Sequence, residues 1–134
     1  MLTGGYVTVF VSNMDRAVRF YSETLGLRLA ERYGDQWASI DAGNGLRIGL
    51  HPASDANPAG RRGSISIGFG ADGPIEEAVP ALERRGVKFD GPIRDDNAGK
   101  FVDFSDPDGH PCYIYQINAE YQRPAASKPA GAAT

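Results

Sequence analysis

The chain has 134 residues, the length of one ordinary domain, and its 41% hydrophobic content is sufficient for a core. A formal net charge of −3, with no basic stripe, argues against nucleic acid as a partner. No apolar stretch approaches the ~18 residues of a membrane span, so no membrane partner is expected. The start "MLTGGYVTVFV" lacks signal-peptide features and the single Cys112 has no internal disulfide partner, which together favour a cytoplasmic location.

The first half of the chain predicts a strand, a helix and three further strands. The run Tyr6–Val11 is rich in β-branched and aromatic residues, which favour a strand. Ser12 and Asp15 have the spacing of a helix-capping pair, and Gly26 supplies a left-handed residue where the helix should end. Between them, apolar residues recur at helical spacing: Met14, Ala17, Val18, Tyr21 and Leu25. The following strands are expected at about Arg28–Arg32, Gln36–Asp41 and Leu46–His51.

The second half repeats this pattern. Ser64–Phe69 predicts a strand, Pro74 suits a first helical turn, and Gly86 marks the helix end. The apolar stripe of this helix consists of Ile75, Val79 and Leu82. Pro80 removes one helical hydrogen bond, so we expect a kink or a helix in short pieces. The remaining strands are expected at about Val87–Phe89, Phe101–Phe104 and Cys112–Gln116.

The two halves therefore share one unit, β-α-β-β-β, which predicts an α+β fold built from two modules. We expect a first module at residues 1–52, a linker at 53–63, a second module at 64–117 and a tail at 118–134. The linker is rich in Pro, Gly, Ala and Asn and has no packing pattern. The Ala- and Pro-rich tail is expected to be flexible, or alternatively an arm that crosses to a second subunit.

Alternation along the strands separates an aliphatic face from a mixed face. The aliphatic face carries Val7, Val9, Val11, Leu46, Ile48, Leu50, Ile65, Ile67, Phe69, Cys112 and Ile114, and should form the core under the helices. The opposite face carries Tyr6, Thr8, Phe10, Trp37, Ser39, Asp41, Arg47, Gly49, His51, Ser64, Ser66, Gly68, Tyr113 and Tyr115. Aromatic rings with sparse polar groups are typical of a concave ligand site. The alternative is an amphipathic sheet with one face in water.

Two segments resemble the signatures of the vicinal-oxygen-chelate superfamily. "FVSNMDRAVRFYSETLGL" is similar to its opening strand and helix, and "FSDPDGHPCYIY" is similar to its closing turn and last strand. This superfamily contains glyoxalase I, extradiol dioxygenases, and fosfomycin- and bleomycin-resistance proteins. The resemblance covers about residues 5–117 and implies two paired βαβββ modules that form a half-open barrel around a small molecule. It also implies a homodimer.

The metal enzymes of this superfamily present His, Gln or Glu side chains to the barrel from three or four strands. Carried over by register, those positions fall on Tyr6, Gly49, Ser64 and Tyr113. None of these is a usual ligand of a divalent metal, so we expect neither a metal at the usual positions nor a cofactor. His51 lies two residues past the usual position, and His110 is expected to face solvent after the turn. Asp106 and Asp108 are interpreted as turn formers and Cys112 as a buried thiol.

The expected ligand contacts are Tyr6, Thr8, Trp37, Arg47, His51, Ser64, Tyr113 and Tyr115. Trp37 either stacks on a planar or cationic ligand or belongs to the core at the barrel mouth. Arg47 either pairs with a carboxylate or phosphate, or lies exposed at the sheet edge. His51 is either an acid–base group near neutral pH or a polar strand end. No catalytic residue is assigned.

The first functional hypothesis is a metal-free small-molecule-binding protein of the glyoxalase/bleomycin-resistance type. The alternative is an enzyme of the same superfamily, a lyase, isomerase or dioxygenase, with a divalent metal at shifted positions or metal-free acid–base chemistry. A third hypothesis is a structural or regulatory dimer with a vestigial pocket, which predicts a filled barrel. The ligand itself cannot be named from the sequence, because fold does not determine function.

Overall fold

The computed structural model describes residues 4–60, 65–96 and 98–118. The first half of the chain forms β1 (Val7–Val11), α1 (Met14–Arg19), the π-helical turn η1 (Phe20–Thr24), β2 (Arg28–Tyr33), β3 (Trp37–Gly43) and β4 (Leu46–Pro52). The second half forms β5 (Ile67–Gly70), α2 (Ile75–Arg84), β6 (Arg94–Asp95), β7 (Gly99–Ser105) and β8 (Pro111–Ile117). The predicted α+β fold with a repeated strand–helix–three-strand unit is confirmed.

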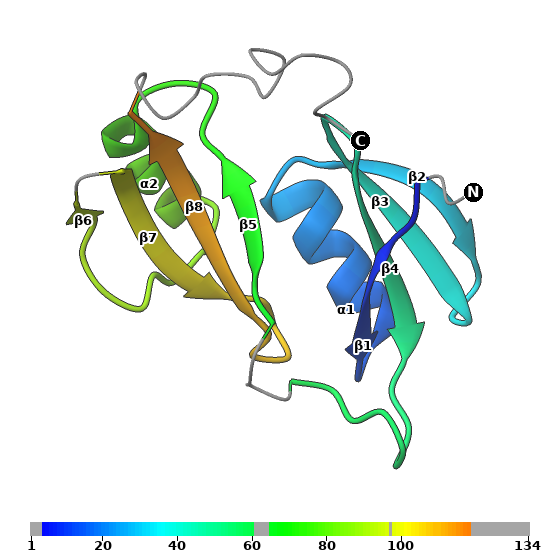
Figure 1. Ribbon diagram of the computed structural model, residues 1–134. Helices are drawn as coiled ribbons and strands as arrows, with labels where there is room; N and C mark the ends of the chain where they lie inside the picture. Colours follow the sequence, from blue (N-terminus) through cyan, green and yellow to red (C-terminus); the bar gives the residue numbers. More distant parts are fainter. Residues whose placement is uncertain (1–3, 61–64, 97, 119–134) are drawn as a thin grey trace, which may run out of the picture.

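The strands form two four-stranded sheets with the same topology. The orders are β1-β4-β3-β2 and β5-β8-β7-β6, and in each sheet the first strand runs parallel to the last. The remaining pairs are antiparallel. The two sheets are not closed into one barrel, and α1 lies between them (Figure 1).

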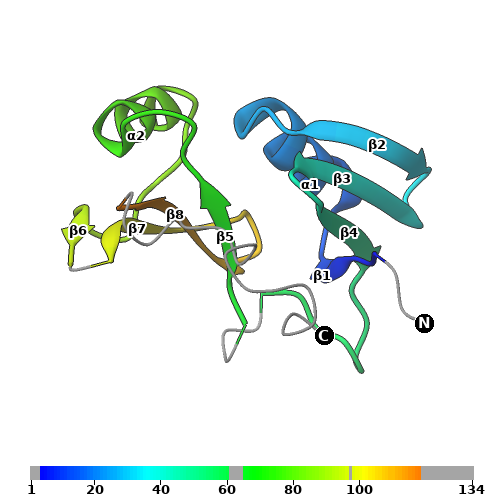
Figure 2. The same cartoon turned by 45° about the horizontal axis from the view of Figure 1, so that its top comes forward.

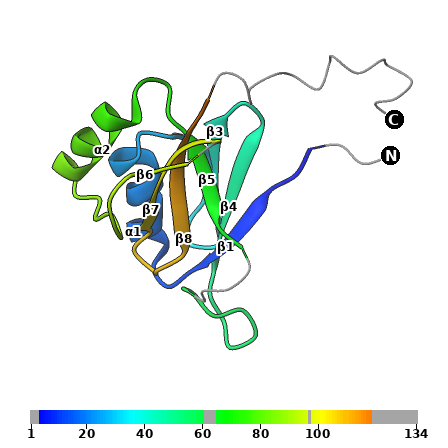
Figure 3. The same ribbon diagram turned by 60° about the vertical axis from the view of Figure 1, so that its left-hand side comes forward.

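Both helices lie on one side of the strands. Figure 2 shows α1 and α2 on the same side of the two sheets, and Figure 3 shows the same layering from the side. Each sheet therefore has one helix-covered face and one face that no helix of the described residues covers; we call the latter the open face. None of these helices is long and apolar enough to cross a membrane.

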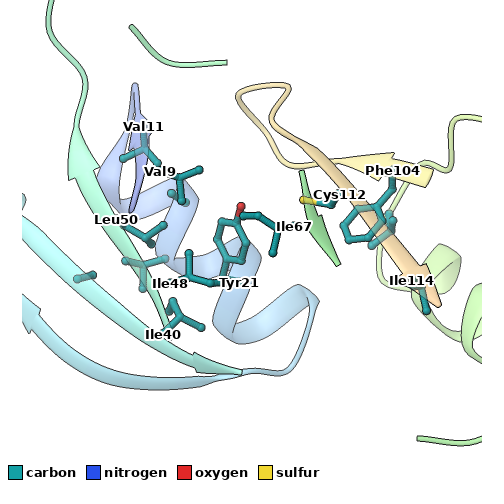
Figure 4. Close-up of a cluster of buried hydrophobic side chains, with 14 of the residues drawn as sticks. Val9, Val11, Tyr21, Ile40, Ile48, Leu50, Ile67, Phe104, Cys112 and Ile114 are labelled. Atoms are coloured by element: carbon teal, nitrogen blue, oxygen red, sulfur yellow. The ribbon is translucent and has the colours of Figure 1, made fainter. Parts of the chain in front are cut away.

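The core lies on the helix-covered faces and is shared by both sheets. Its buried members are Val9, Val11, Met14, Ala17, Val18, Tyr21, Ala38, Ile40, Ile48, Leu50, Ile67, Ile75, Val87, Val102, Phe104, Cys112 and Ile114. Figure 4 shows Tyr21 of η1 between side chains of the first sheet and Ile67 of the second. The predicted aliphatic alternation is confirmed for most positions, because successive strand residues point to opposite faces. The prediction is wrong for Val7, which is 37% exposed at the start of β1, and for Ile65, which is 72% exposed because β5 begins only at Ile67.

Helix α1 begins one residue later than the sequence indicated. Asn13 is the N-cap, and its side chain accepts a hydrogen bond from the backbone N–H of Arg16 at 2.9 Å. Ser12 instead contacts the second half of the chain, because its backbone N–H donates a hydrogen bond to Asp108 Oδ2 at 3.1 Å. The predicted end of the helical segment is confirmed, since Gly26 follows η1 with a φ of 75°.

Two further expectations in the second half are corrected. Val87–Phe89 is not a strand: the N–H of Val87 donates to Leu82 at the end of α2, and Phe89 forms only an isolated bridge with Phe104. The edge strand is the short β6. Helix α2 passes through Pro80 as one element and is not divided into short pieces. At its first turn the N–H of Ile75 donates to Gln116 Oε1 at 2.7 Å.

The turn between β7 and β8 joins the two halves of the chain. Asp106 Oδ2 accepts a hydrogen bond from the hydroxyl of Tyr21 at 2.7 Å and lies 2.6 Å from Nδ1 of His110. Two residues on, Asp108 accepts from both the N–H and the hydroxyl of Ser12 and forms an ion pair with Arg16 at 3.2 Å. The two segments that resemble the superfamily signatures are therefore in direct contact, because side chains of the second hydrogen-bond to residues of the first.

The expectation that His110 faces solvent is wrong. The residue is only 9% exposed, because its ring is held between Asp106 and the backbone of Gly60. Asp106 is also more than a turn former. Its buried carboxylate accepts two backbone N–H groups, from Asp108 and His110, in addition to the Tyr21 hydroxyl.

Candidate functional site

The open face of the first sheet consists of three rows of side chains that run across the four strands. The first row is Tyr6, Arg47, Asp41 and Arg28. The second row is Thr8, Gly49, Ser39 and Glu31. The third row is Phe10, His51, Trp37 and Tyr33. Five of the predicted ligand contacts, Tyr6, Thr8, Trp37, Arg47 and His51, are thus brought onto one surface.

The indole of Trp37 leans out of its own row and lies over Gly49. A Cβ built on Gly49 would overlap Cη2 of the indole and stand 3.0 Å from Cζ3. The ring then meets Tyr6 edge-on, with ring centroids 5.4 Å apart and an interplanar angle of 84°. Gly49 is therefore the position that gives the indole room to lie against the sheet. It also means that a position matched to a metal ligand in the superfamily is covered by an aromatic ring.

Glu31 and Tyr33 belong to this face, although the sequence did not indicate it. Ser39 is fully buried and its Oγ donates to Glu31 Oε1 at 3.2 Å, while Tyr33 OH lies 3.5 Å from Glu31 Oε2. A register shift between Leu29 and Glu31 explains the omission. Strict alternation from Arg28 would put Glu31 and Tyr33 on the opposite face, and a bulge reverses that order.

The first row of this open face carries a carboxylate, Asp41, whose charge is balanced by a neighbouring arginine. Arg28 forms an ion pair with Asp41 at 2.8 Å. The hydrogen bond from Arg28, and after it the N–H of Gly43, lower the pKa of the Asp41 carboxyl, with a smaller contribution from Arg47. Arg47 itself is exposed and stands opposite Asp41.

His51 stands at the strand end of the third row. Its ring is exposed and meets Phe10 edge-on, with centroids 5.7 Å apart. Nδ1 lies 2.9 Å from the carbonyl oxygen of Pro52, which can only accept, so Nδ1 carries the hydrogen. That hydrogen bond fixes the ring beside Phe10, and in the neutral ring Nε2 is then the nitrogen that can accept a hydrogen bond.

The open face of the second sheet repeats the pairing of an aromatic ring with glycine. A Cβ built on Gly68 would overlap the ring of Tyr113, and one on Gly70 would stand 3.2 Å from Tyr115 OH. The two tyrosine rings lie 6.1 Å apart at 48°. Phe101 and the ion pair of Asp103 with Arg94 at 3.1 Å border them on β7 and β6. The predicted contact Ser64 lies outside the described residues.

The predicted contacts are therefore divided between two surfaces. In the described residues, each ring contact found on an open face joins residues of one sheet, Tyr6 with Trp37, Phe10 with His51, or Tyr113 with Tyr115. A separate cavity of about 310 Å³ lies where β1 meets the residues just before β5. Its walls include Val7, Phe10, Pro58, Ile65 and His110. Of the predicted contacts, Thr8 borders this cavity.

The described residues include no group of three or more His, Cys, Asp or Glu side chains placed to hold a metal ion. The expectation of a metal-free site stays a prediction. Cys112 is buried, and burial first, then the charge of Asp106, raises the pKa of its thiol to about 12. A thiol with that pKa stays protonated at neutral pH and is not a nucleophile.

Residues 4–112 match the Glyoxalase/Bleomycin resistance protein/Dioxygenase superfamily, and the chain belongs to this family. Its fold is similar to that of TnmS3, an antibiotic binding protein from Streptomyces sp. CB03234, with 28% identity and a TM-score of 0.73 over 88% of this chain and 98% of that one. A glyoxalase/bleomycin resistance protein from the same Streptomyces has 28% identity and a TM-score of 0.66, over 85% of this chain and 100% of that one.

A superfamily member from Sphaerobacter thermophilus DSM 20745, at 24% identity, shares the fold with a TM-score of 0.68, over 86% of this chain and 97% of that one. No curated protein matches the sequence significantly.

Proposed function

We propose that this protein binds a small organic molecule, as a binding protein of the glyoxalase/bleomycin-resistance type. The observation that carries the proposal is the indole of Trp37, which lies over Gly49 on the open face with Tyr6 at its edge. An aromatic ring fixed in this way offers a flat surface that loses little conformational freedom when a ligand stacks on it. TnmS3, which is similar to this chain in fold, is described as an antibiotic binding protein.

The proposed contacts are the eight predicted residues together with Glu31 and Tyr33. Trp37, Tyr6, Tyr113 and Tyr115 supply aromatic walls, and Arg47 and His51 supply polar contacts at the borders. Sites for small molecules are mostly apolar, with a few polar groups that fix orientation. On the open face of the first sheet the aromatic rings lie beside polar side chains such as Arg47 and His51, which supports a flat organic ligand that carries polar groups.

We further propose that the working form is a homodimer in the cytoplasm, with no nucleic acid or membrane partner. Each chain presents two aromatic surfaces on separate sheets. In a symmetric dimer, the first sheet of one copy can face the second sheet of its partner, and the same contact occurs twice. Each of the two sites would then hold Trp37 from one copy and Tyr113 from the other.

Fluorescence of Trp37, the single tryptophan, tests the function directly. We expect saturable changes in its emission with antibiotics that contain fused aromatic rings, and none with aliphatic antibiotics of similar mass. Binding of the fused-ring antibiotics, measured by calorimetry, should be weaker in Trp37→Phe. It should be unchanged in Phe20→Leu, which alters an aromatic residue of η1. The absence of saturable binding to any member of the panel would overturn the proposal, and metal-dependent turnover would favour the enzyme alternative.

A further inference from the structure

We propose that the aromatic end of the first open face recognises an organic ammonium group on the ligand. The site consists of the rings of Tyr6, Tyr33 and Trp37 and the carboxylate of Glu31, and we call it the ammonium site. The inference rests on the proposed function and specifies the chemistry of the ligand. It requires that the molecule stacked against Trp37 carry a positive charge close to the indole.

The rings of the ammonium site are accessible rather than packed into the core. Tyr6 is 47% exposed and Tyr33 is 63% exposed. Tyr33 stands directly opposite Trp37 in the β2–β3 register, and Tyr6 meets Trp37 edge-on at 5.4 Å. Trp37 therefore has Tyr6 as its ring neighbour on the β1 side and Tyr33 as its register partner on the β2 side. Accessible aromatic rings attract a cation through their electron-rich faces.

Glu31 supplies the negative charge at this place. Its Oε1 accepts from the buried hydroxyl of Ser39 at 3.2 Å, and its Oε2 lies 3.5 Å from Tyr33 OH. These two contacts hold the carboxylate beside Ser39, whose register partner on β4 is Gly49, the residue under the indole of Trp37. Both partners are neutral donors, so they orient the carboxylate without compensating its charge.

The two carboxylates on this face differ in their partners. Asp41 has Arg28 at 2.8 Å, and Arg47 stands opposite it on β4. No ion pair of the described residues includes Glu31, so its charge has no protein cation. An uncompensated carboxylate among accessible rings favours a cation that comes with the ligand.

The charges on this face also give the ligand a direction. The guanidinium groups of Arg28 and Arg47 lie in the row of Asp41, while Glu31 lies in the next row toward Trp37. An ammonium group is repelled by these two guanidinium groups and attracted toward Trp37, Tyr33 and Glu31. The ligand therefore places its cationic end over Trp37 and Tyr33, and any acidic group toward Arg47.

Choline and 3,3-dimethylbutan-1-ol test the proposal because they have the same shape and differ in charge. Titration of the wild-type protein at constant ionic strength, followed by Trp37 fluorescence, should show about tenfold tighter binding of choline, the preference expected for a cation bound by aromatic rings and a carboxylate together. Glu31→Gln keeps the acceptor for Ser39 and removes the charge, so the preference should fall below about threefold. Glu83→Gln, on the exposed side of α2, is the matched control and should leave the preference unchanged.

Three outcomes would overturn the ammonium site: equal affinities for the two probes, no saturation by choline, or an unchanged preference in Glu31→Gln. Circular dichroism of the variant establishes that it is folded before the comparison. The fused-ring panel of the preceding subsection separates the two proposals. If Glu31→Gln and the wild type bind that panel equally and choline shows no preference, the ammonium site fails and the binding function stands.

Discussion

The imidazole of His110 accepts a hydrogen bond from the backbone N–H of Gly60, with 3.1 Å between Nε2 and the nitrogen. Nδ1 of the same ring lies 2.6 Å from Asp106 Oδ2. Because Nε2 accepts, the ring in this arrangement is neutral and carries its hydrogen on Nδ1. His110 thus connects the end of the linker to the turn that holds α1, and protonation of Nε2 breaks that connection.

Acidification should therefore release Gly60 before the fold is lost. Burial alone would lower the pKa of His110, but the hydrogen bond and charge of Asp106 outweigh it and raise the pKa above its usual value. As the pH falls through this raised pKa, the Gly60 N–H loses its acceptor, and its exchange with solvent, corrected for intrinsic pH dependence, should accelerate. Amide hydrogen exchange followed by NMR measures this. An unchanged protection factor for Gly60 across the titration of His110 would contradict it.

The global stability should change in the opposite direction over the same titration. A raised pKa in the folded state means that protonated His110 is favoured by folding. Its contribution is fully present below the unfolded pKa of ~6.5 and is lost as the pH rises through the folded pKa. Urea unfolding of the wild type and of His110→Asn at several pH values should therefore differ in slope over this range. Parallel pH profiles for the two proteins would show that His110 does not contribute in this way.

Removal of the hydroxyl in Tyr21→Phe should destabilise the protein. The hydroxyl is buried, and burial first, then Asp106, raise its pKa well above the usual value, so it remains a donor. Loss of a buried hydrogen bond to a carboxylate costs about 1.5–3 kcal/mol of unfolding free energy. Urea denaturation measures this, with Tyr33→Phe, at a 63% exposed position, as the control that should change stability by less than ~0.5 kcal/mol. Equal effects of the two substitutions would contradict the role of the Tyr21–Asp106 bond.

Gly49→Ala should displace the indole of Trp37 without unfolding the protein. The added methyl group would overlap the ring, which belongs to a half-exposed side chain that is able to rotate away. We expect a shift in tryptophan emission and at least a severalfold loss of affinity for the fused-ring ligands. Gly91→Ala, where a Cβ meets nothing within 4 Å, is the control and should alter neither. Retention of wild-type emission and affinity in Gly49→Ala would remove the main support for the aromatic site.

The strand alternation was the most reliable guide to this structure, because a period of two separates the buried Val9 and Ile48 from the open-face Thr8 and Gly49. Its failures have local causes. The bulge in β2 reverses the order before Glu31, and a single sequence gives no sign of an unpaired residue such as Ala30.

Tertiary contacts explain the remaining differences. Ser12 and Asn13 are both suitable N-cap residues. Ser12 hydrogen-bonds to Asp108, which is far along the chain, and Asn13 therefore caps α1. His110 follows a turn that the sequence alone predicts to be exposed, yet its ring is buried by partners that only the folded chain brings near. The pairing of the two halves thus depends on residues that local patterns describe as turn formers.

Gly60→Ala should be one of the most damaging single-methyl substitutions in the linker. Gly60 has a φ of 72°, and a Cβ there would overlap the carbonyl oxygen of Asp108, which is backbone held by the turn. The cost combines left-handed strain of about 1 kcal/mol with displacement of the turn from α1. Gly45→Ala isolates the first component, since Gly45 has a φ of 90° and a Cβ there meets nothing within 4 Å. Unfolding free energies should therefore fall by about 1 kcal/mol for Gly45→Ala and by clearly more for Gly60→Ala. Equal decreases in unfolding free energy would mean that the linker accommodates the methyl group without displacing the turn. The contact of Gly60 with the turn would then not help to hold the two halves together.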